Sequence, residues 1–139
     1  MAFLNDLDAQ FAGQSVLIQY TGGEPTVYPG FEEILKHGKS LGFHHSIISN
    51  ASRKPRFWEK FASYFDKVHF TFHQEFANLE HFTNIVNIVS EHVLVHVNFT
   101  MIPEIFDDIY TAASTLAGKD NVTITLKALR INFGSALYP

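Results

Sequence analysis

The chain contains no cysteine among its 139 residues, and this absence restricts its chemistry more than any other feature of the composition. Without thiols, the chain cannot supply the thiolate ligands that iron–sulfur clusters need. It also lacks any apolar run near the roughly 18 to 20 residues of a membrane span. Acidic residues occur near its start, where a secretory signal would be basic. We therefore expect a cytoplasmic protein without a membrane partner.

The chain also lacks an excess of positive charge. Its formal net charge is −4, and we expect no basic cluster that would offset this negative charge locally. This balance argues against an electrostatic surface for nucleic acid. The hydrophobic content of 46%, with 14% aromatic residues, is enough to fill the core of one folded domain over residues 1–139. A small-molecule ligand is the partner we expect.

Strand-like and helix-like patterns alternate along the chain with a period of roughly 25 residues, which is typical of βα units. An N-terminal helical segment around residues 3–11 comes first. The predicted strands cover residues 16–20, 45–49, 68–72, 93–97 and 122–126, and the predicted helices cover 31–41, 57–65, 79–91 and 105–117. Helical crossovers require parallel strands. The pattern leaves either an open doubly wound sheet or part of a barrel.

Several predicted strands alternate apolar and polar residues, which fixes their two faces. Val68, Phe70 and Phe72 share one face, while His69 and Thr71 lie on the other. The apolar faces should pack on the helices. The polar faces are too hydrophilic for a sealed barrel core, so we expect a cleft that holds a ligand. An ordinary sheet with one solvated face is the alternative.

Polar residues collect at or just past the carboxyl ends of the predicted strands, where parallel α/β folds bind ligands. The strand at 16–20 is followed by an exposed-backbone segment of Gly22 and Gly23 beside a carboxylate, Glu24. The candidate site residues are Thr21, Gly22, Gly23, Glu24, Pro25, Asn50, His73, Glu75, Asn98, Lys127 and Arg130.

This order of strand ends resembles the radical S-adenosylmethionine (radical SAM) superfamily. The resemblance covers about residues 3–130 and depends on the segment TGGEP, the strand end at Asn50 and the strand end at His73. It implies a partial (β/α)6 barrel in which residues 22–25 hold the methionyl amino group of SAM. Asn50, His73 and Glu75 would then lie near the ribose and the methionine carboxylate, with Asn98, Lys127 and Arg130 as weaker assignments.

The chain departs from that family at its cluster. The family holds a [4Fe–4S] cluster by CxxxCxxC in the loop after its first strand, and this chain has no cysteine. We therefore expect a truncated core of about five parallel strands, missing the first strand and the cluster loop. The cluster would belong only to a longer parent, and the isolated chain would be inactive. Residues 16–20 would form an open edge, available for self-association or pairing with a partner.

Other interpretations remain open at this level. The same cleft could hold SAM or a similar zwitterion without chemistry, or His73 and Glu75 could act as acid and base in an enzyme that needs no cluster. Glu24 could merely cap the following helix, and Lys127 with Arg130 could clamp an anion or lie free on the surface. His69, His73 and His96 could bind a metal, although ordinary hydrogen-bonded histidines fit better.

Overall fold

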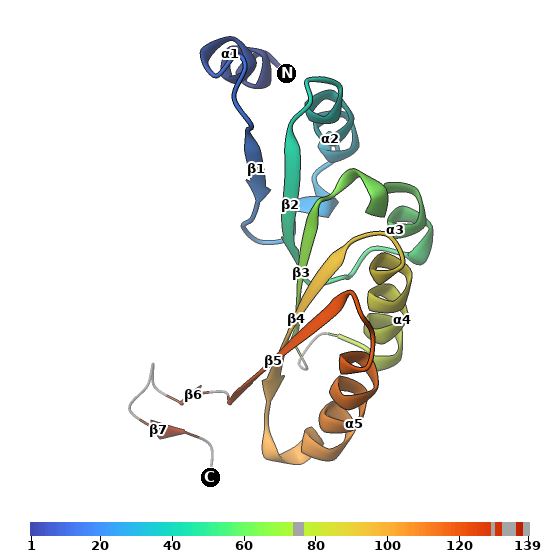
Figure 1. Cartoon of the computed structure of the whole chain (residues 1–139). Helices are drawn as coiled ribbons and strands as arrows, with labels where there is room; N and C mark the ends of the chain where they lie inside the picture. The colour runs from blue at the N-terminus through green and yellow to red at the C-terminus, as the bar shows by residue number, and fades with distance from the viewer. Residues whose placement is uncertain (74–76, 129, 132–135, 138–139) are drawn as a thin grey trace.

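The chain folds around one five-stranded sheet, seen in a computed structural model that describes residues 1–73, 77–128, 130–131 and 136–137 (Figure 1). The strands of this sheet are β1 Leu17–Tyr20, β2 His44–Ser49, β3 Lys67–Phe72, β4 Leu94–Met101 and β5 Val122–Ala128. The helices are α1 Ala2–Gln10, α2 Phe31–Ser40, α3 Pro55–Phe61, α4 Leu79–Ser90 and α5 Phe106–Ala117. Three 3₁₀ turns, Pro25–Val27, Ala62–Tyr64 and Pro103–Ile105, and a short antiparallel pair, β6 Arg130–Ile131 with β7 Ala136–Leu137, complete the described elements.

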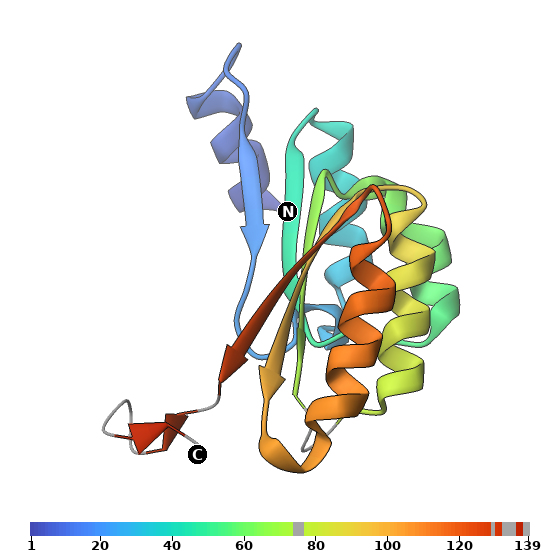
Figure 2. The ribbon, with the colours of Figure 1, turned by 60° about the horizontal axis from the view of Figure 1, so that its bottom comes forward.

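All neighbouring strands of the sheet are parallel and pair in chain order, β1-β2-β3-β4-β5. This confirms the predicted α/β fold of parallel strands with helical crossovers. Helices α2, α3, α4 and α5 lie together on one face of the sheet (Figure 2). A doubly wound sheet carries helices on both faces, so the described part of the chain is singly wound. Among the described strands, β1 and β5 form the two edges.

The helix-covered face holds the core because its strand residues alternate as the sequence predicts. Val68 and Phe70 have no exposed surface and Phe72 is 2% exposed. The Trp58 ring of α3 meets Phe70 edge-on at 5.0 Å between centroids, and the Phe82 ring of α4 contacts Phe72 at 5.1 Å. Each fully buried side chain of this size contributes about 1.5–3 kcal/mol to stability, so these aromatic contacts fix α3 and α4 on the sheet.

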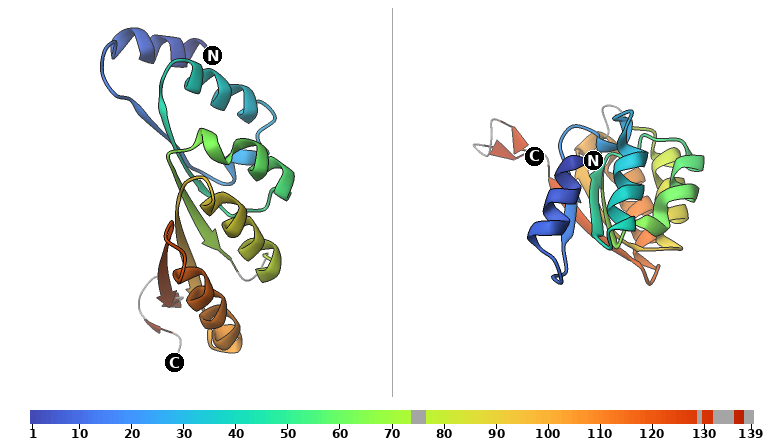
Figure 3. Two further views of the ribbon diagram at one scale, coloured as in Figure 1. Left: turned by 45° about the vertical axis from the view of Figure 1, so that its right-hand side comes forward. Right: turned by 90° about the horizontal axis from the view of Figure 1, so that it is seen from above.

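The opposite face is polar and is not covered by helices α2–α5 (Figure 3). Residues on it include His44, Lys67, His69, His96 and Thr123, and none of the five strands contains an aspartate or glutamate. The acidic residues that the structure describes therefore lie on helices and loops. Within the described ranges, no helix has the length and apolar character that crossing a bilayer requires.

Helix α2 lies against β2 with very little space at one point. A Cβ atom on Gly38 would come within 2.5 Å of His45 Cε1. The His45 ring is completely buried there and stacks on Tyr20, at 5.6 Å between ring centroids. The absence of a side chain at position 38 therefore lets an imidazole fill the space between helix and sheet.

Two boundaries differ from the prediction in a way that matters for the site. Strand β4 runs on to Met101, so Asn98 lies inside the strand, beside Thr71 and Thr125, rather than at its end. The sequence predicts a strand end at this polar residue, but Asn98 continues the alternation on the open face. Helix α3 begins at Pro55, earlier than predicted, because proline suits the first turn of a helix.

Candidate functional site

The loop after β1 presents bare backbone at the carboxyl edge of the sheet. Residues 21–23 are exposed, and apart from adjacent residues no atom lies within 4 Å of the positions that Cβ atoms of Gly22 and Gly23 would take. Gly22 has φ +130°, a conformation that residues with a side chain rarely adopt. Backbone carbonyl and amide groups of this segment are therefore accessible to a ligand.

Glu24 ties this loop to the end of β2. Its Oε1 accepts hydrogen bonds from the Thr26 amide at 3.2 Å and the Thr26 hydroxyl at 2.7 Å. Its Oε2 accepts one from the Asn50 amide at 2.7 Å, and the Ser49 hydroxyl lies 3.0 Å from both oxygens. The carboxylate thus caps the 3₁₀ turn Pro25–Val27 and at the same time fixes two βα loops to each other. We call Glu24 with Thr26, Ser49 and Asn50 the rim clamp.

The chain turns sharply directly after the rim clamp. Ala51 is buried and has φ +59°, a left-handed conformation that is uncommon for residues other than glycine. The Ser49 hydroxyl accepts a hydrogen bond from the Ala51 amide at 3.1 Å, and Asn50 Oδ1 accepts one from the Ser52 amide at 3.0 Å. His81 Nε2 of α4 donates to the Ala51 carbonyl at 3.1 Å. These bonds hold the turn in its strained shape.

A cavity of about 450 Å³ opens beside this turn. It lies between the end of β2, the end of β3 and the start of α4, and its lining includes Asn50, Ser52, His73, Asn78 and His81. Asn78 Oδ1 caps α4 by accepting from the His81 amide at 2.8 Å. Pockets of this size hold small organic ligands. We call this space the rim cavity.

The candidate residues predicted from the sequence fall into two groups. Residues 21–25 and Asn50 are joined by the rim clamp, and Asn50 shares the rim cavity with His73. Asn98 and Lys127 lie on strands β4 and β5, on the same open face as His96, and do not line the rim cavity. Arg130 lies in β6, and Glu75 falls outside the described residues. Their roles as ligand contacts stay predictions.

Two histidines of the open face lie close together, and one of them is held by hydrogen bonds. Both ring nitrogens of His96 contact threonine hydroxyls, Nδ1 with Thr123 at 2.8 Å and Nε2 with Thr125 at 3.2 Å. The His69 ring lies 5.5 Å from that of His96, and partial burial, then Lys67 and His96, lower the pKa of His69. Within the described residues, no group of three potential metal ligands comes together.

Behind the loop after β1, the half-buried side chain of Tyr20 and the buried side chain of His45 support the strand end. The Tyr20 hydroxyl lies 2.8 Å from His45 Nδ1, and burial raises the pKa of Tyr20 to about 12. Burial, followed by the charge of Lys39, lowers the pKa of His45 to about 4. Both side chains are therefore neutral near pH 7, and the hydrogen bond between them fixes β1 on β2.

Four residues of the site were not among the candidates from the sequence. Thr26 and Ser49 complete the rim clamp, His81 holds the Ala51 turn, and Asn78 caps α4 beside the rim cavity. Asn78 carries a signal that sequence alone could use, since asparagine is favoured directly before a helix. Ser49 and His81 carry none, because their roles depend on which loops meet in three dimensions.

Comparisons with known proteins identify the fold. No family model and no curated protein sequence matches this chain. Among solved structures it is similar to archaeal TYW1, a radical SAM enzyme, with a TM-score of 0.52 at 20% sequence identity. The match covers 82% of this chain and 44% of that one, so the chain spans less than half of that protein's length. The five parallel strands and their helices thus form an α/β fold similar to part of archaeal TYW1.

Proposed function

We propose that this chain is a radical SAM-related core domain or fragment that binds S-adenosylmethionine at the rim formed by β1, β2 and β3. One observation carries the proposal. The rim clamp brings the exposed backbone of residues 21–23 next to Asn50, which lines the rim cavity together with His73. Groups for an α-amino acid and a space for a nucleoside therefore lie side by side. The similarity of fold to archaeal TYW1 supports the same assignment.

The residues at the rim suit the chemistry of SAM. Its ammonium group needs hydrogen-bond acceptors, which the exposed backbone carbonyls of residues 21–23 supply. Its ribose hydroxyls and carboxylate need donors and acceptors, which Asn50 and His73 supply at the mouth of a cavity of about 450 Å³. Glu24 is a positioning residue in this proposal, because its carboxylate oxygens already bond to Thr26, Ser49 and Asn50.

The residues present do not fit a [4Fe–4S] cluster. Such clusters are held by cysteine thiolates, and this chain has none. We therefore assign no chemical step to the isolated chain. In this proposal, reductive cleavage of SAM would need a longer parent or a partner chain that supplies the thiolates. The lack of cysteine equally favours a second candidate function, a module that binds SAM without any reaction.

Isothermal titration calorimetry with SAM tests the binding proposal. We expect saturable binding, and we expect His73→Ala to weaken it by about tenfold, the effect of one lost hydrogen bond to a charged group. His92→Ala is the matched control, because His92 is an exposed histidine just past α4 and does not line the rim cavity. Absence of binding at millimolar SAM, or equal loss in both variants, would exclude the proposal.

Iron and sulfide analysis after anaerobic reconstitution tests the second part. The isolated chain should retain no stoichiometric cluster, while SAM still binds. A stable cluster on this chain alone would contradict the view that it lacks the ligands for radical chemistry. Mixing the chain with a candidate cysteine-bearing partner then distinguishes a core that is completed in trans from a module that only binds.

A further inference from the structure

A second concavity, on the helix side of the rim, carries an unusual concentration of positive charge. Its volume is about 660 Å³, and its lining includes Arg53, Lys54, Arg56 and Lys60. These are four of the ten lysines and arginines of a chain whose formal net charge is −4. The expectation that no basic cluster exists is therefore wrong. Arg53, Lys54 and Arg56 are interrupted only by Pro55, and Lys60 follows Arg56 one turn later along α3.

The one carboxylate in this basic concavity shows where an anion fits. Glu32 of α2 faces Arg53 Nη2 at 3.8 Å through Oε1 and Lys60 Nζ at 3.6 Å through Oε2. Cations from the β2–α3 loop and from α3 therefore converge on one oxyanion position. Both contacts are long for ion pairs that donate hydrogen bonds, which are usually below 3 Å. Four cations and a single carboxylate line the concavity, so its lining has a formal charge of +3.

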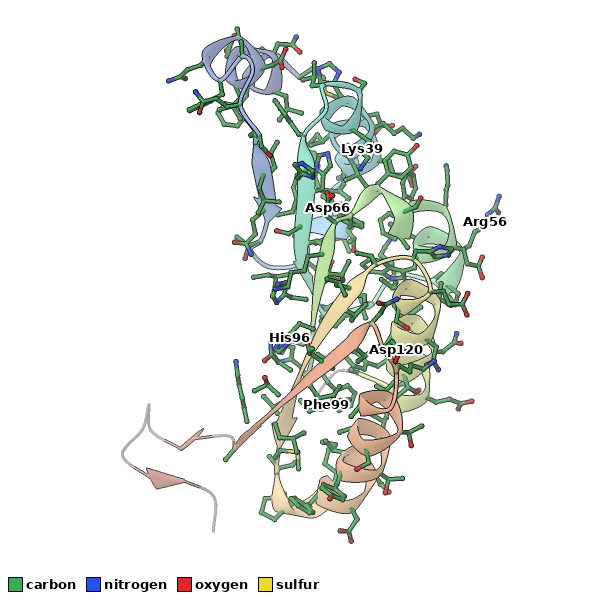
Figure 4. All side chains as sticks on the ribbon, in the orientation of Figure 1. Lys39, Arg56, Asp66, His96, Phe99 and Asp120 are labelled. Carbon is green, nitrogen blue, oxygen red and sulfur yellow. The ribbon has the colours of Figure 1, made fainter. Side chains whose placement is uncertain are left out.

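Two of the cations are available to a ligand. Within the described residues, Lys54 and Arg56 form no ion pair, and both are exposed. In Figure 4, the Arg56 side chain extends away from the body of the molecule into solvent. The Arg53 guanidinium and the Lys60 ammonium meet at the Glu32 carboxylate, and groups placed in this way match the oxygens of a phosphate group, which several such donors can bind at once.

The aromatic residues of the concavity argue for a small ligand and against a nucleic acid strand. Single-stranded nucleic acids bind by stacking bases on free aromatic rings along a basic groove. Here Arg53 lies over the Phe57 ring at 4.6 Å, and Lys60 and Lys36 approach the Phe61 ring centroid at 4.8 and 5.6 Å. Both rings are also buried. The concavity thus offers charge without a stacking surface.

We propose that this basic concavity binds the phosphate group of a small phosphorylated ligand, with Glu32 as a competing internal anion. The site is distinct from the rim cavity, although Ser52 lines both spaces. Phosphate oxygens would replace the long contacts of Glu32 with Arg53 and Lys60 and would add contacts to Lys54 and Arg56. Binding at this site does not depend on whether the rim cavity holds SAM.

Calorimetric titration with inorganic pyrophosphate tests the proposal on the whole chain. We expect saturable binding that weakens as salt is added, because the interaction is electrostatic. The double variant Arg56→Ala with Lys60→Ala should bind at least about tenfold more weakly. Lys119→Ala is the matched control, since Lys119 is an exposed lysine just past α5 and is absent from the concavity.

Glu32→Gln provides a result that a merely structural role would not give. Removing the competing carboxylate should strengthen pyrophosphate binding by several-fold relative to the wild-type chain. Saturable binding of SAM to the double variant would show that the two sites are separate. The proposal is overturned if pyrophosphate does not bind at millimolar concentration, if Lys119→Ala weakens it equally, or if Glu32→Gln has no effect. Tighter binding of a single-stranded oligonucleotide than of pyrophosphate would also overturn it.

Discussion

Replacing Glu24 by glutamine should disconnect the loop after β1 from the end of β2. In the rim clamp, one carboxylate oxygen faces the Thr26 amide and hydroxyl, and the other faces the Asn50 amide at 2.7 Å. A glutamine side chain has the same shape but only one acceptor oxygen. Its NH₂ group must therefore face a backbone N–H donor in either orientation of the amide, which places two donors against each other.

The magnitude of this loss follows from the bonds involved. A hydrogen bond to a charged group contributes about 1.5–3 kcal/mol, and the half-buried position of Glu24 gives its unpaired partners limited access to water. We therefore expect Glu24→Gln to lower the free energy of unfolding by about 2 kcal/mol. Equilibrium urea unfolding measures this change, and hydrogen exchange of the Asn50 amide should accelerate in parallel.

Glu59→Gln is the control for this experiment, because Glu59 is an exposed glutamate on α3 outside the rim clamp. Exposed substitutions of this kind usually change stability by less than about 0.5 kcal/mol. If Glu24→Gln stayed within that limit, the clamp would not be holding the two loops together. Unchanged exchange at Asn50 would lead to the same conclusion, even if the variant were globally less stable.

The buried histidine and the exposed sheet edge give two further predictions. Because the pKa of His45 falls from 6.5 to about 4 on folding, the unfolded chain is protonated at His45 before the folded chain as the pH drops. The free energy of unfolding should therefore decrease by about 3 kcal/mol between pH 6.5 and 4. Urea unfolding at a series of pH values measures this decrease, which should be smaller in His45→Gln. Leu17 lies on edge strand β1 and is 62% exposed, so we expect the chain to self-associate through this edge. Sedimentation velocity at high concentration should detect this association in the wild-type chain and not in Leu17→Lys. A wild-type chain that stays monomeric would exclude the edge as an interface.

The order of helices and strands could be predicted from the sequence, because the local spacing of apolar and polar residues determines each element. The apolar positions of residues 68–72 are buried on the helix side, as predicted, and the crossovers between strands forced a parallel sheet. The end of β4 was less predictable. Asn98 has the polarity of a loop residue, but on an open face a polar side chain costs no desolvation and the strand continues.

The site was only partly predictable for a different reason. Two consecutive glycines, Gly22 and Gly23, are enough to predict an exposed turn from the sequence alone. The partners of Glu24 do not, because Ser49 and Asn50 follow it by some 25 residues and meet it only when two parallel strands align. The contact of Glu32 with the basic concavity was unpredictable for the same reason, since Glu32 belongs to α2 while Arg53 and Lys60 belong to the next βα unit.

The close approach of Gly38 to His45 sets a reciprocal size rule between two distant positions. A methyl group at position 38 has no room while an imidazole occupies the space across from it. Natural variation at these two positions should therefore be coupled, with any larger residue on α2 accompanied by a smaller one on β2. Since His45 also forms a hydrogen bond with Tyr20, a larger residue at position 38 of α2 would break that hydrogen bond to β1.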